Sequence, residues 1–382
     1  MPDAEKLAAV RDALPALGAG IYLNTAAVGP LPAEVAAAMD EYAARELQTG
    51  RGHPDDVEAG IERIAEARAG VAAILATDVE AIRLSHGAAD GIHRTIDAID
   101  WRPGDRLLTT TDEAPDVAAE IEALERRHEV AVDAVDPPLD GDAQMTATAF
   151  SRALTSRTRL VVASHVLPSS GKALPIEAIA AAAHDHGALI VVDGSRAVGA
   201  IPVAVEGTQA DAYAVAAENW LLGPEGIGAL WVRPELGERI GASSEFHKPS
   251  VVGFARSCGW LSMYVGLPWI VDRGTSLAAG AAARLATIDG VTVLTPPGAM
   301  ATIVSFRIRD WPADEAVREL GSRVFAIAAS VPRLDAIRIS VGFFTTEAEL
   351  ERFAAAVELL AAHTPESLPP KPRLAILGQD ER

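Results

Sequence analysis

The sequence has little cysteine, little lysine and no long apolar run. Cys258 is its single cysteine, so an intramolecular disulfide and a metal site built from several thiolates are both excluded. We interpret Cys258 as a small buried hydrophobic residue, with a nucleophile as the alternative. No stretch of about 18 apolar residues occurs, which predicts that no helix spans a membrane. The first twenty residues lack the apolar centre of a signal peptide, so we expect a cytoplasmic protein.

Basic residues are also scarce. The 33 lysines and arginines stand against 53 aspartates and glutamates, which gives a net charge of −20. Because no basic stripe is present to neutralise phosphates, we expect no nucleic-acid partner. Apolar residues make up 49% of the chain and charged residues 23%, which is typical of a soluble globular protein with a large core.

Short apolar runs alternate with alanine-rich helical patterns over most of the chain. Such alternation, with strands that are almost continuously apolar, predicts an α/β fold with a mostly parallel sheet covered by helices on both faces. The predicted strands are 81–84, 106–110, 130–135, 160–163, 189–192, 212–216 and 229–232. The predicted helices are 32–46, 55–75, 117–127, 147–154 and 176–186.

The pattern changes after about residue 240, where a smaller α+β unit is expected. Its predicted strands are 301–307 and 336–340, and its predicted helices are 313–326 and 347–362. We therefore expect a helical segment at 1–20, a large α/β domain at 21–270, a small α+β domain at 271–365 that includes the N-terminal segment, and an irregular, proline-rich tail at 366–382.

Seven segments carry a more specific pattern. They are IYLNTAAVGPLP (21–32), LSHGAADGI (84–92), SHVLPSSGKALPI (164–176), VVDGSRAVG (191–199), ENWLLGPEGIGALWV (218–232), GTSLAA (274–279) and DAIRISVGFFTTEAELERF (335–353). In this order they resemble class V aminotransferases of the isopenicillin-N-epimerase-like and cysteine-desulfurase-like branch. The resemblance implies the pyridoxal-phosphate (PLP) fold type I, like that of aspartate aminotransferase. It implies a large domain around a mixed, mostly parallel seven-stranded sheet, plus a C-terminal α+β domain.

Several residues match the family's cofactor-binding positions. His86, Gly87 and Ala88 follow a strand and open a helix, so their backbone N–H groups could hold a phosphate; a plain strand–turn–helix junction is the alternative. Asp193 is implied to be the carboxylate that keeps the pyridine nitrogen protonated, or else to cap the loop that follows it. Thr275 resembles the residue that reaches a neighbouring subunit's phosphate, which implies a homodimer.

Two residues match the family's substrate-binding positions. Arg338 resembles the arginine that holds a substrate α-carboxylate by a two-point fork, a geometry that suits arginine and not lysine. Asn24 lies where the family approaches the same carboxylate. The resemblance therefore implies a small-molecule substrate with a carboxylate. An ordinary ion pair is the alternative for Arg338.

Four departures from the family surround one cofactor position. Asn219 stands where the family has the Schiff-base lysine, and an amide can neither form an imine nor act as a general base near neutral pH. Ala216 replaces a phosphate-binding hydroxyl. Ala114 replaces an aromatic or histidine ring that stacks on the cofactor. Arg196 replaces a glutamine or histidine that meets the ring oxygen. We therefore expect no covalently bound cofactor.

The remaining lysines are few. Lys6 and Lys371 lie near the termini, whereas Lys172 and Lys248 fall in segments that border the family's cofactor region. A relocated Schiff base on one of these two is an alternative, although lysine side chains are usually solvated. Non-covalent binding of PLP or of its aminated form, PMP, is a further alternative.

Three functions remain open. The first is a repurposed, PLP-independent enzyme that acts on an amino-acid-like or carboxylate substrate, a role that secondary metabolism would suit. Its candidate catalytic residues are His86, Glu113, Glu218 and Asn219, and its candidate substrate-binding residues are Asn24, Arg196 and Arg338. The second is a non-catalytic binding or scaffold protein, which the fold alone would allow. The third is an enzyme of lyase or aminotransferase type that uses PLP or PMP non-covalently. No metal is expected in any of them.

Overall fold

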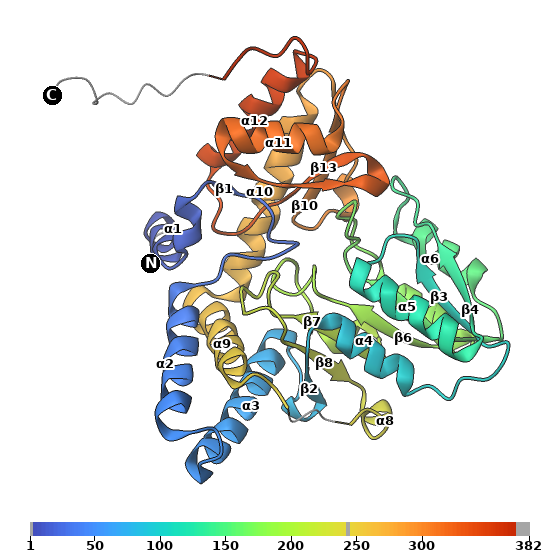
Figure 1. The fold of residues 1–382 in the computed structure, drawn as a ribbon. Coiled ribbons are helices and arrows are strands. Elements are labelled where there is room, and N and C mark those ends of the chain that lie inside the picture. Colours follow the sequence, from blue (N-terminus) through green and yellow to red (C-terminus); the bar gives the residue numbers. More distant parts are fainter. Residues whose placement is uncertain (1–2, 242–244, 372–382) are drawn as a thin grey trace.

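The computed structural model describes residues 3–241 and 245–371, and Figure 1 shows their arrangement. The larger part is built on a seven-stranded sheet with the strand order β2-β8-β7-β6-β5-β3-β4. Strand β8 runs antiparallel to both of its neighbours, and every other neighbouring pair is parallel. The sheet is mixed and mostly parallel, as the sequence predicted. The strands are β2 (Ile82–Ser85), β3 (Arg106–Thr110), β4 (Ala131–Val135), β5 (Thr158–Ser164), β6 (Leu189–Asp193), β7 (Ala212–Ala216) and β8 (Gly228–Val232).

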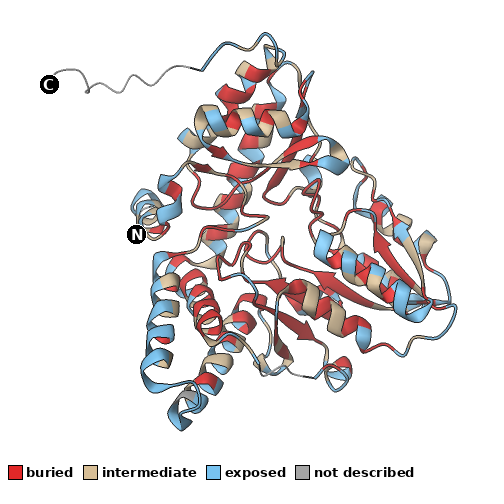
Figure 2. Ribbon diagram, in the orientation of Figure 1, coloured by how far each residue is buried: buried red, intermediate tan, exposed pale blue. Residues whose placement is uncertain are grey.

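Helices cover both faces of this sheet. One face packs against α4 (Ala88–Asp97) and α5 (Pro115–His128), and the other packs mainly against α3 (Pro54–Leu75), α6 (Ala143–Ala153) and α7 (Ile176–Asp185). Strands β5 and β6 send alternate side chains into the two cores, so both sets are apolar. This explains the continuous apolar runs. Figure 2 shows the strands buried between helices whose outer surfaces are exposed.

Three further helices extend the large part. They are α2 (Ala33–Thr49), α8 (Pro234–Gly237) and α9 (Lys248–Gly259). Helix α9 packs against α2 and α3 and ends in a π-helical turn, Trp260–Val265. Cys258 lies in α9 with no exposed surface, and burial raises the pKa of its thiol, so its interpretation as a small hydrophobic residue is correct.

The C-terminal part is built on a four-stranded antiparallel sheet with the order β12-β13-β10-β9. Helices pack on it around a second core. The strands are β9 (Val291–Val293), β10 (Ile303–Ile308), β12 (Ala329–Val331) and β13 (Ala336–Ser340), and the helices are α10 (Leu267–Ala286), α11 (Ala313–Val324) and α12 (Glu347–Ala361). Helix α10 passes through residue 271, where the sequence predicted the small domain to begin.

The N-terminal segment contacts both parts of the molecule. It contains α1 (Asp3–Asp12) and a 3₁₀ turn (Pro15–Gly18), and its Val10 and Leu14 belong to the core of the large part. Strand β1 (Ile21–Tyr22) then pairs in parallel with β11 (Ala326–Ile327) of the C-terminal part. Of the predicted irregular tail, residues 372–382 lie outside the described part of the chain.

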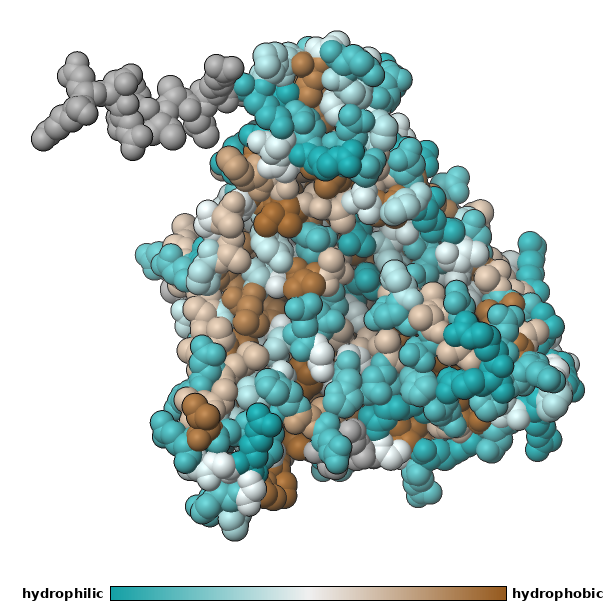
Figure 3. Space-filling view, viewed as in Figure 1, coloured by the Kyte–Doolittle hydropathy of each residue, from teal (hydrophilic) through white to brown (hydrophobic). Residues whose placement is uncertain are grey.

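Within residues 3–241 and 245–371, no helix is both long and apolar enough to cross a lipid bilayer. The space-filling view in Figure 3 shows apolar and polar residues interspersed over the visible face.

Candidate active site

The site is organised by the carboxyl ends of parallel strands, which meet at one edge of the sheet. Ser164 ends β5 and lies beside Asp193, which ends β6. Ligands of α/β proteins bind at this edge. Asp193 is 3% exposed, and its Oδ1 accepts a hydrogen bond from the backbone N–H of Ser195 at 2.8 Å.

Glu113 is held beneath this edge by two hydroxyl groups. Ser164 Oγ donates to its Oε2 at 2.6 Å, and Thr110 Oγ1 donates to its Oε1 at 2.6 Å. The pKa of the Glu113 carboxyl is raised to about 7, mainly by burial. The hydrogen bonds from Ser164 and Thr110 lower it, and the nearby charge of Asp193 raises it. Near neutral pH this carboxyl can therefore gain or lose a proton.

Asn219 follows β7 and is 5% exposed. Its Nδ2 donates to the backbone oxygen of Ala26 at 3.0 Å and to that of Ala27 at 2.8 Å. Both N–H groups of the amide are thus used to hold the N-terminal loop against the sheet edge. The geometry gives Asn219 a positioning role, which differs from the catalytic role considered for it.

Glu218 precedes Asn219 and is half-buried. Burial raises the pKa of its carboxyl, and the charges of Glu225, Asp116 and Asp193 act in the same direction. Its Oε2 is buried and has no hydrogen-bond partner among the described residues. The raised pKa of Glu218 and the unpartnered Oε2 make this carboxyl a candidate for contact with a ligand.

Arg196 and Arg338 bring positive charge to the same place. An Arg196 Nη1 lies 3.6 Å from Asp193 Oδ2, and an Arg338 Nη1 donates to the backbone oxygen of Pro168 at 2.9 Å. Burial lowers the pKa of Arg338 to about 10, and repulsion by Arg196 adds to this effect, while Asp112 opposes it. The two guanidinium groups therefore lie close enough to repel each other.

Asn24 reaches the same region from the N-terminal segment. It forms a backbone bridge with Ser340, which follows Arg338 by two residues on β13 and so lies on the same face of that strand. The structure thus brings together seven of the predicted site residues, namely Asn24, Glu113, Asp193, Arg196, Glu218, Asn219 and Arg338.

The other predicted positions are placed differently. The exposed ring of His86 packs against Phe246 at 4.9 Å between ring centroids, and its side chain makes no hydrogen bond to this cluster among the described residues. Thr275 uses its hydroxyl within its own helix, where it donates to the Val271 oxygen at 2.7 Å. Gly87 caps the N-terminus of α4 with a φ of 116°, and Ala88 begins that helix. A Cβ built on Gly87 would meet no atom within 4 Å, so the space above this turn is open.

Both internal lysines, Lys172 and Lys248, have other partners in this arrangement. Lys172 is 1% exposed, and its Nζ donates to the oxygens of Pro138 at 2.5 Å, Gly141 at 2.7 Å and Thr146 at 3.0 Å. Lys248 Nζ lies 3.8 Å from Glu46 on α2. Lys172 is a structural cation that ties two loops together.

Sequence reasoning missed the residues that support the site. Tyr213 OH lies 2.7 Å from Nδ1 of His165, and burial lowers the pKa of that histidine to about 4, so it is neutral at physiological pH. Ser164 and Asp112 were also missed. The position of Ser164 at the end of an apolar strand was the available signal, whereas the partners of Asp112 and Tyr213 lie far away along the chain.

The residues do not fit a covalently attached PLP. The only side chain at the expected imine position is the amide of Asn219, and both of its N–H groups are already bonded to carbonyl oxygens. Ala216 and Ala114 are buried and offer neither a hydroxyl nor a stacking ring. Arg196 approaches Asp193, the acid that the resemblance assigns to the pyridine nitrogen. Among the described residues, no group of three histidine, cysteine or acidic side chains is arranged to hold a metal ion.

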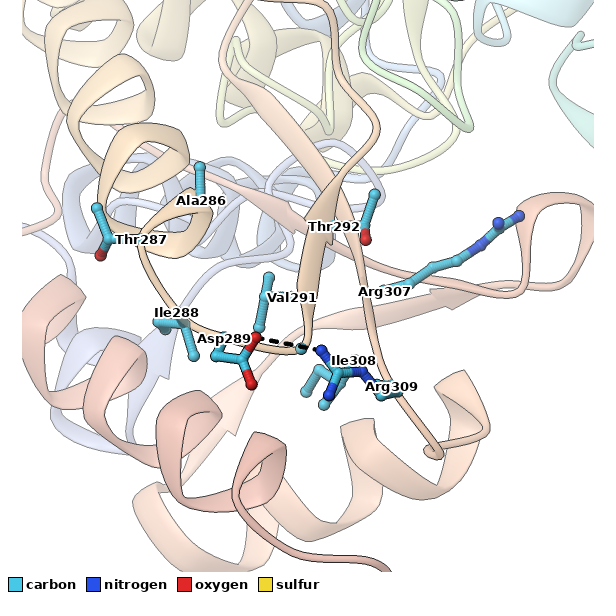
Figure 4. A pocket seen from close by; sticks show the side chains of 10 residues that line it. Ala286, Thr287, Ile288, Asp289, Val291, Thr292, Arg307, Ile308 and Arg309 are labelled. Atoms are coloured by element: carbon cyan, nitrogen blue, oxygen red, sulfur yellow. Dashed lines mark hydrogen bonds and ion pairs between the residues drawn. The ribbon is translucent and has the colours of Figure 1, made fainter.

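A separate groove of about 650 Å³ lies at the edge of the C-terminal sheet (Figure 4). Figure 4 shows Asp289 and Arg309 joined across it, with a distance of 3.2 Å between Oδ1 and Nη2. Both side chains are largely exposed, and none of the predicted site residues lines the groove. Its ion pair belongs to a solvated surface, so the sheet edge remains the candidate site.

Comparison with known proteins agrees with this architecture. The chain is 26% identical over 390 residues to isopenicillin N epimerase of Streptomyces clavuligerus, a match that covers 89% of this chain and 94% of that protein. Its fold is similar to that of a lysine-to-alanine mutant of C-DES with glycine covalently linked to PLP (TM-score 0.85, 21% identity, 94% of this chain and 99% of that one). It is also similar to the apo cysteine desulfurase of Thermococcus onnurineus NA1 (TM-score 0.82, 20% identity, 93% and 98%). These likenesses bear out the fold expected from the sequence. Residues 21–353 match the family described as aminotransferase class V, and the chain therefore belongs to that family.

Proposed function

We propose that this protein is a class V aminotransferase relative that no longer binds PLP covalently and acts as a PLP-independent enzyme on an amino-acid-like or other carboxylate substrate. One observation carries the proposal: buried polar atoms without partners gather around the sheet edge. At this edge these atoms are Asn24 Oδ1, Ser195 Oγ, Arg196 Nε, Glu218 Oε2, Arg338 Nε and Ser340 Oγ, and further such atoms occur elsewhere among the described residues.

Such atoms are costly in a folded protein. A buried donor or acceptor that has lost its partner destabilises the fold by roughly 1–3 kcal/mol. A site without a ligand would gain stability by pairing these groups or replacing them with apolar ones. Their presence at one edge of the sheet supports a polar ligand as their partner.

The side chains also suggest roles. Arg338 has a guanidinium fork that suits a carboxylate, and Asn24 bridges Ser340, two residues further along β13. The pKa of Glu113 is raised to about 7, which suits a group that accepts and returns a proton near neutral pH, and the pKa of Glu218 is raised as well. Asn219 holds the N-terminal loop in place for them. Tyr213 and Ser164 orient His165 and Glu113.

Two other functions each have one supporting observation. The approach of Arg196 to Asp193 partly fills the space where a cofactor would lie, which favours a non-catalytic binding protein. The likeness to a C-DES mutant that carries PLP although a lysine was replaced by alanine favours non-covalent use of PLP or PMP.

Spectroscopy and ligand binding separate these functions. For the proposed enzyme, protein incubated with PLP should show no visible absorbance after desalting, and borohydride should fix no cofactor. A reducible adduct on Lys172 or Lys248, located by mass spectrometry, would overturn the proposal, and stable retention of PLP or PMP without an adduct would support the non-covalent alternative.

Carboxylate binding should depend on Arg338. The change Arg338→Ala should weaken the binding of small carboxylates by roughly 2–5 kcal/mol, as for one lost partner of a buried charge pair. Arg307→Ala on neighbouring strand β10 is the control, because Arg307 is exposed. If both variants bind carboxylates as the unchanged protein does, the scaffold function is favoured.

A further inference from the structure

Arg196 and Arg338 approach each other from separate parts of the molecule. Arg196 follows β6 of the large sheet, whereas Arg338 lies on β13 of the C-terminal sheet. They are close enough for each charge to act on the other, and Asp112 acts on both. The resemblance implies a glutamine or histidine at the position of Arg196, so the second cation is a property of this chain.

Few of the donors of these arginines are used. Each guanidinium group carries five N–H donors. Among the described residues, Arg338 makes one hydrogen bond, to Pro168, and Arg196 makes none; the Nε atom of each is buried and unpaired. The side chain of Arg196 is only 13% exposed, so water cannot reach most of it.

The nearby acids, Asp193 and Asp112, accept no hydrogen bond from these arginines. The distance of 3.6 Å between Arg196 Nη1 and Asp193 Oδ2 is too long for a hydrogen bond, and Asp193 already accepts one from Ser195. Asp112 accepts from the backbone N–H of Ser169 at 3.2 Å. Both acids compensate charge, but neither satisfies the N–H groups of the arginines.

One carboxylate has about four acceptor positions, which is fewer than the donors left over on the two arginines. We infer that Arg196 is a second anion-binding residue and that the ligand is a dicarboxylic acid, with one carboxylate on Arg338 and the other on Arg196. The inference rests on the proposed function, since it assumes that the site binds a carboxylate at all. It adds the substrate class and assigns the residue that selects it.

The test compares acids with one and two carboxylates. Malonate, succinate, glutarate and adipate are titrated into the protein by calorimetry beside acetate, propionate, butyrate and valerate, at one ionic strength. At least one dicarboxylate should bind about 10- to 100-fold more tightly than the monocarboxylate of similar length, the range expected for one charge-assisted contact. In Arg196→Gln this preference should fall to about 1. Arg196→Lys should restore part of it, and Arg307→Gln is the matched control.

The outcomes are distinct. Equal binding of mono- and dicarboxylates overturns the inference, and so does an Arg196→Gln variant that is folded by circular dichroism but weakens both classes equally, because one carboxylate would then bridge both arginines. A preference for 3-phosphonopropionate over every dicarboxylate also overturns it. If no carboxylate binds the unchanged protein, the proposed function fails as well. If monocarboxylates bind in an Arg338-dependent way without a preference for dicarboxylates, the proposed function stands and only the inference fails.

Discussion

A lysine ammonium and an asparagine amide can both donate hydrogen bonds, but only the lysine side chain can titrate and form an imine. At position 219 the amide uses its two N–H groups on the oxygens of Ala26 and Ala27. No titratable group remains at this place, so a proton must be held by another side chain. Glu218 and Glu113, whose pKa values are raised, are the side chains next to the sheet edge that can do so.

Glu113 should make the stability of the protein depend on pH. Its pKa is about 7 in the folded state and about 4.5 in an unfolded chain, so the folded state binds more protons between these values. The free energy of unfolding should therefore fall as pH rises through this window, by up to about 3 kcal/mol from this group. In Glu113→Gln this part of the pH dependence should be absent.

Urea unfolding at about pH 5 and about pH 8 measures this pH dependence of the free energy of unfolding. The difference between the unchanged protein and the variant isolates Glu113 from His165, whose lowered pKa acts with the opposite sign as pH falls. Glu34→Gln, at an exposed position of α2, is the matched control for the loss of one carboxyl. The same slope in Glu113→Gln as in the unchanged protein would show that this carboxyl is ionised in the fold.

Between elements, Lys172 joins the loop after β5 to the segment that leads into α6. Its ammonium satisfies two backbone oxygens and the hydroxyl of Thr146, and its backbone forms a bridge with Met300 of the C-terminal part. A buried charge is tolerated here because three acceptors surround it. The residue therefore stabilises the junction on one side of the site.

The change Lys172→Met should test this role. Methionine fills a similar volume but leaves two carbonyl groups and a hydroxyl without their donor, so we expect a loss of about 2–4 kcal/mol in the free energy of unfolding. Lys248→Met is the matched control, because the contact of Lys248 with Glu46 is partly exposed and should contribute less than about 1 kcal/mol. Equal stabilities of the two variants in urea would contradict the structural role of Lys172.

Elements that are long or fully buried could be predicted from the sequence, and short ones could not. The strands at 106–110, 212–216 and 336–340 have the predicted bounds. Their apolar runs end at turns, which marks where each strand begins and ends. Strands β9 and β11 are too short and too exposed to give a pattern, and they exist because of partners elsewhere in the chain.

The same distinction holds for the site. Asp193 and Arg338 could be placed from local motifs, since each belongs to a strand with a recognisable sequence. The hydrogen bond from Asn219 to Ala26 and the one from Ser164 to Glu113 join residues that are far apart in sequence. No local pattern encodes such contacts, so they required the structure.

For the molecule as a whole, we expect a homodimer. In the family resemblance Thr275 has a ligand-facing role only across a subunit interface, and within one chain its hydroxyl contacts its own helix. Met263 and Tyr264, in the π-helical turn before α10, are 85% and 56% exposed, which is unusual for side chains of this size and polarity. An interface over this turn would bury them.

Analytical ultracentrifugation at micromolar concentration should give the mass of two chains. Met263→Glu should shift the protein toward the mass of one chain, because it would place a charge in an apolar contact. Phe325→Glu, at another exposed apolar position in the C-terminal part, should leave the dimer intact. A single-chain mass for the unchanged protein would rule out the dimer at this concentration.

The pairing of β1 with β11, together with the bridge between Asn24 and Ser340, has a consequence for how the protein is made. Strand β1 and Asn24 are translated long before their partners β11 and Ser340, whereas Val10 and Leu14 pack on the large part. The pairing of β1 and the bridge of Asn24 can therefore form only after β11 and β13 have been translated, and contacts between distant parts of a chain form slowly. Until then the segment after Leu23 is open to proteases and chaperones. A nascent chain that stops before β13 lacks Arg338 and Ser340, so we expect that it does not assemble the site.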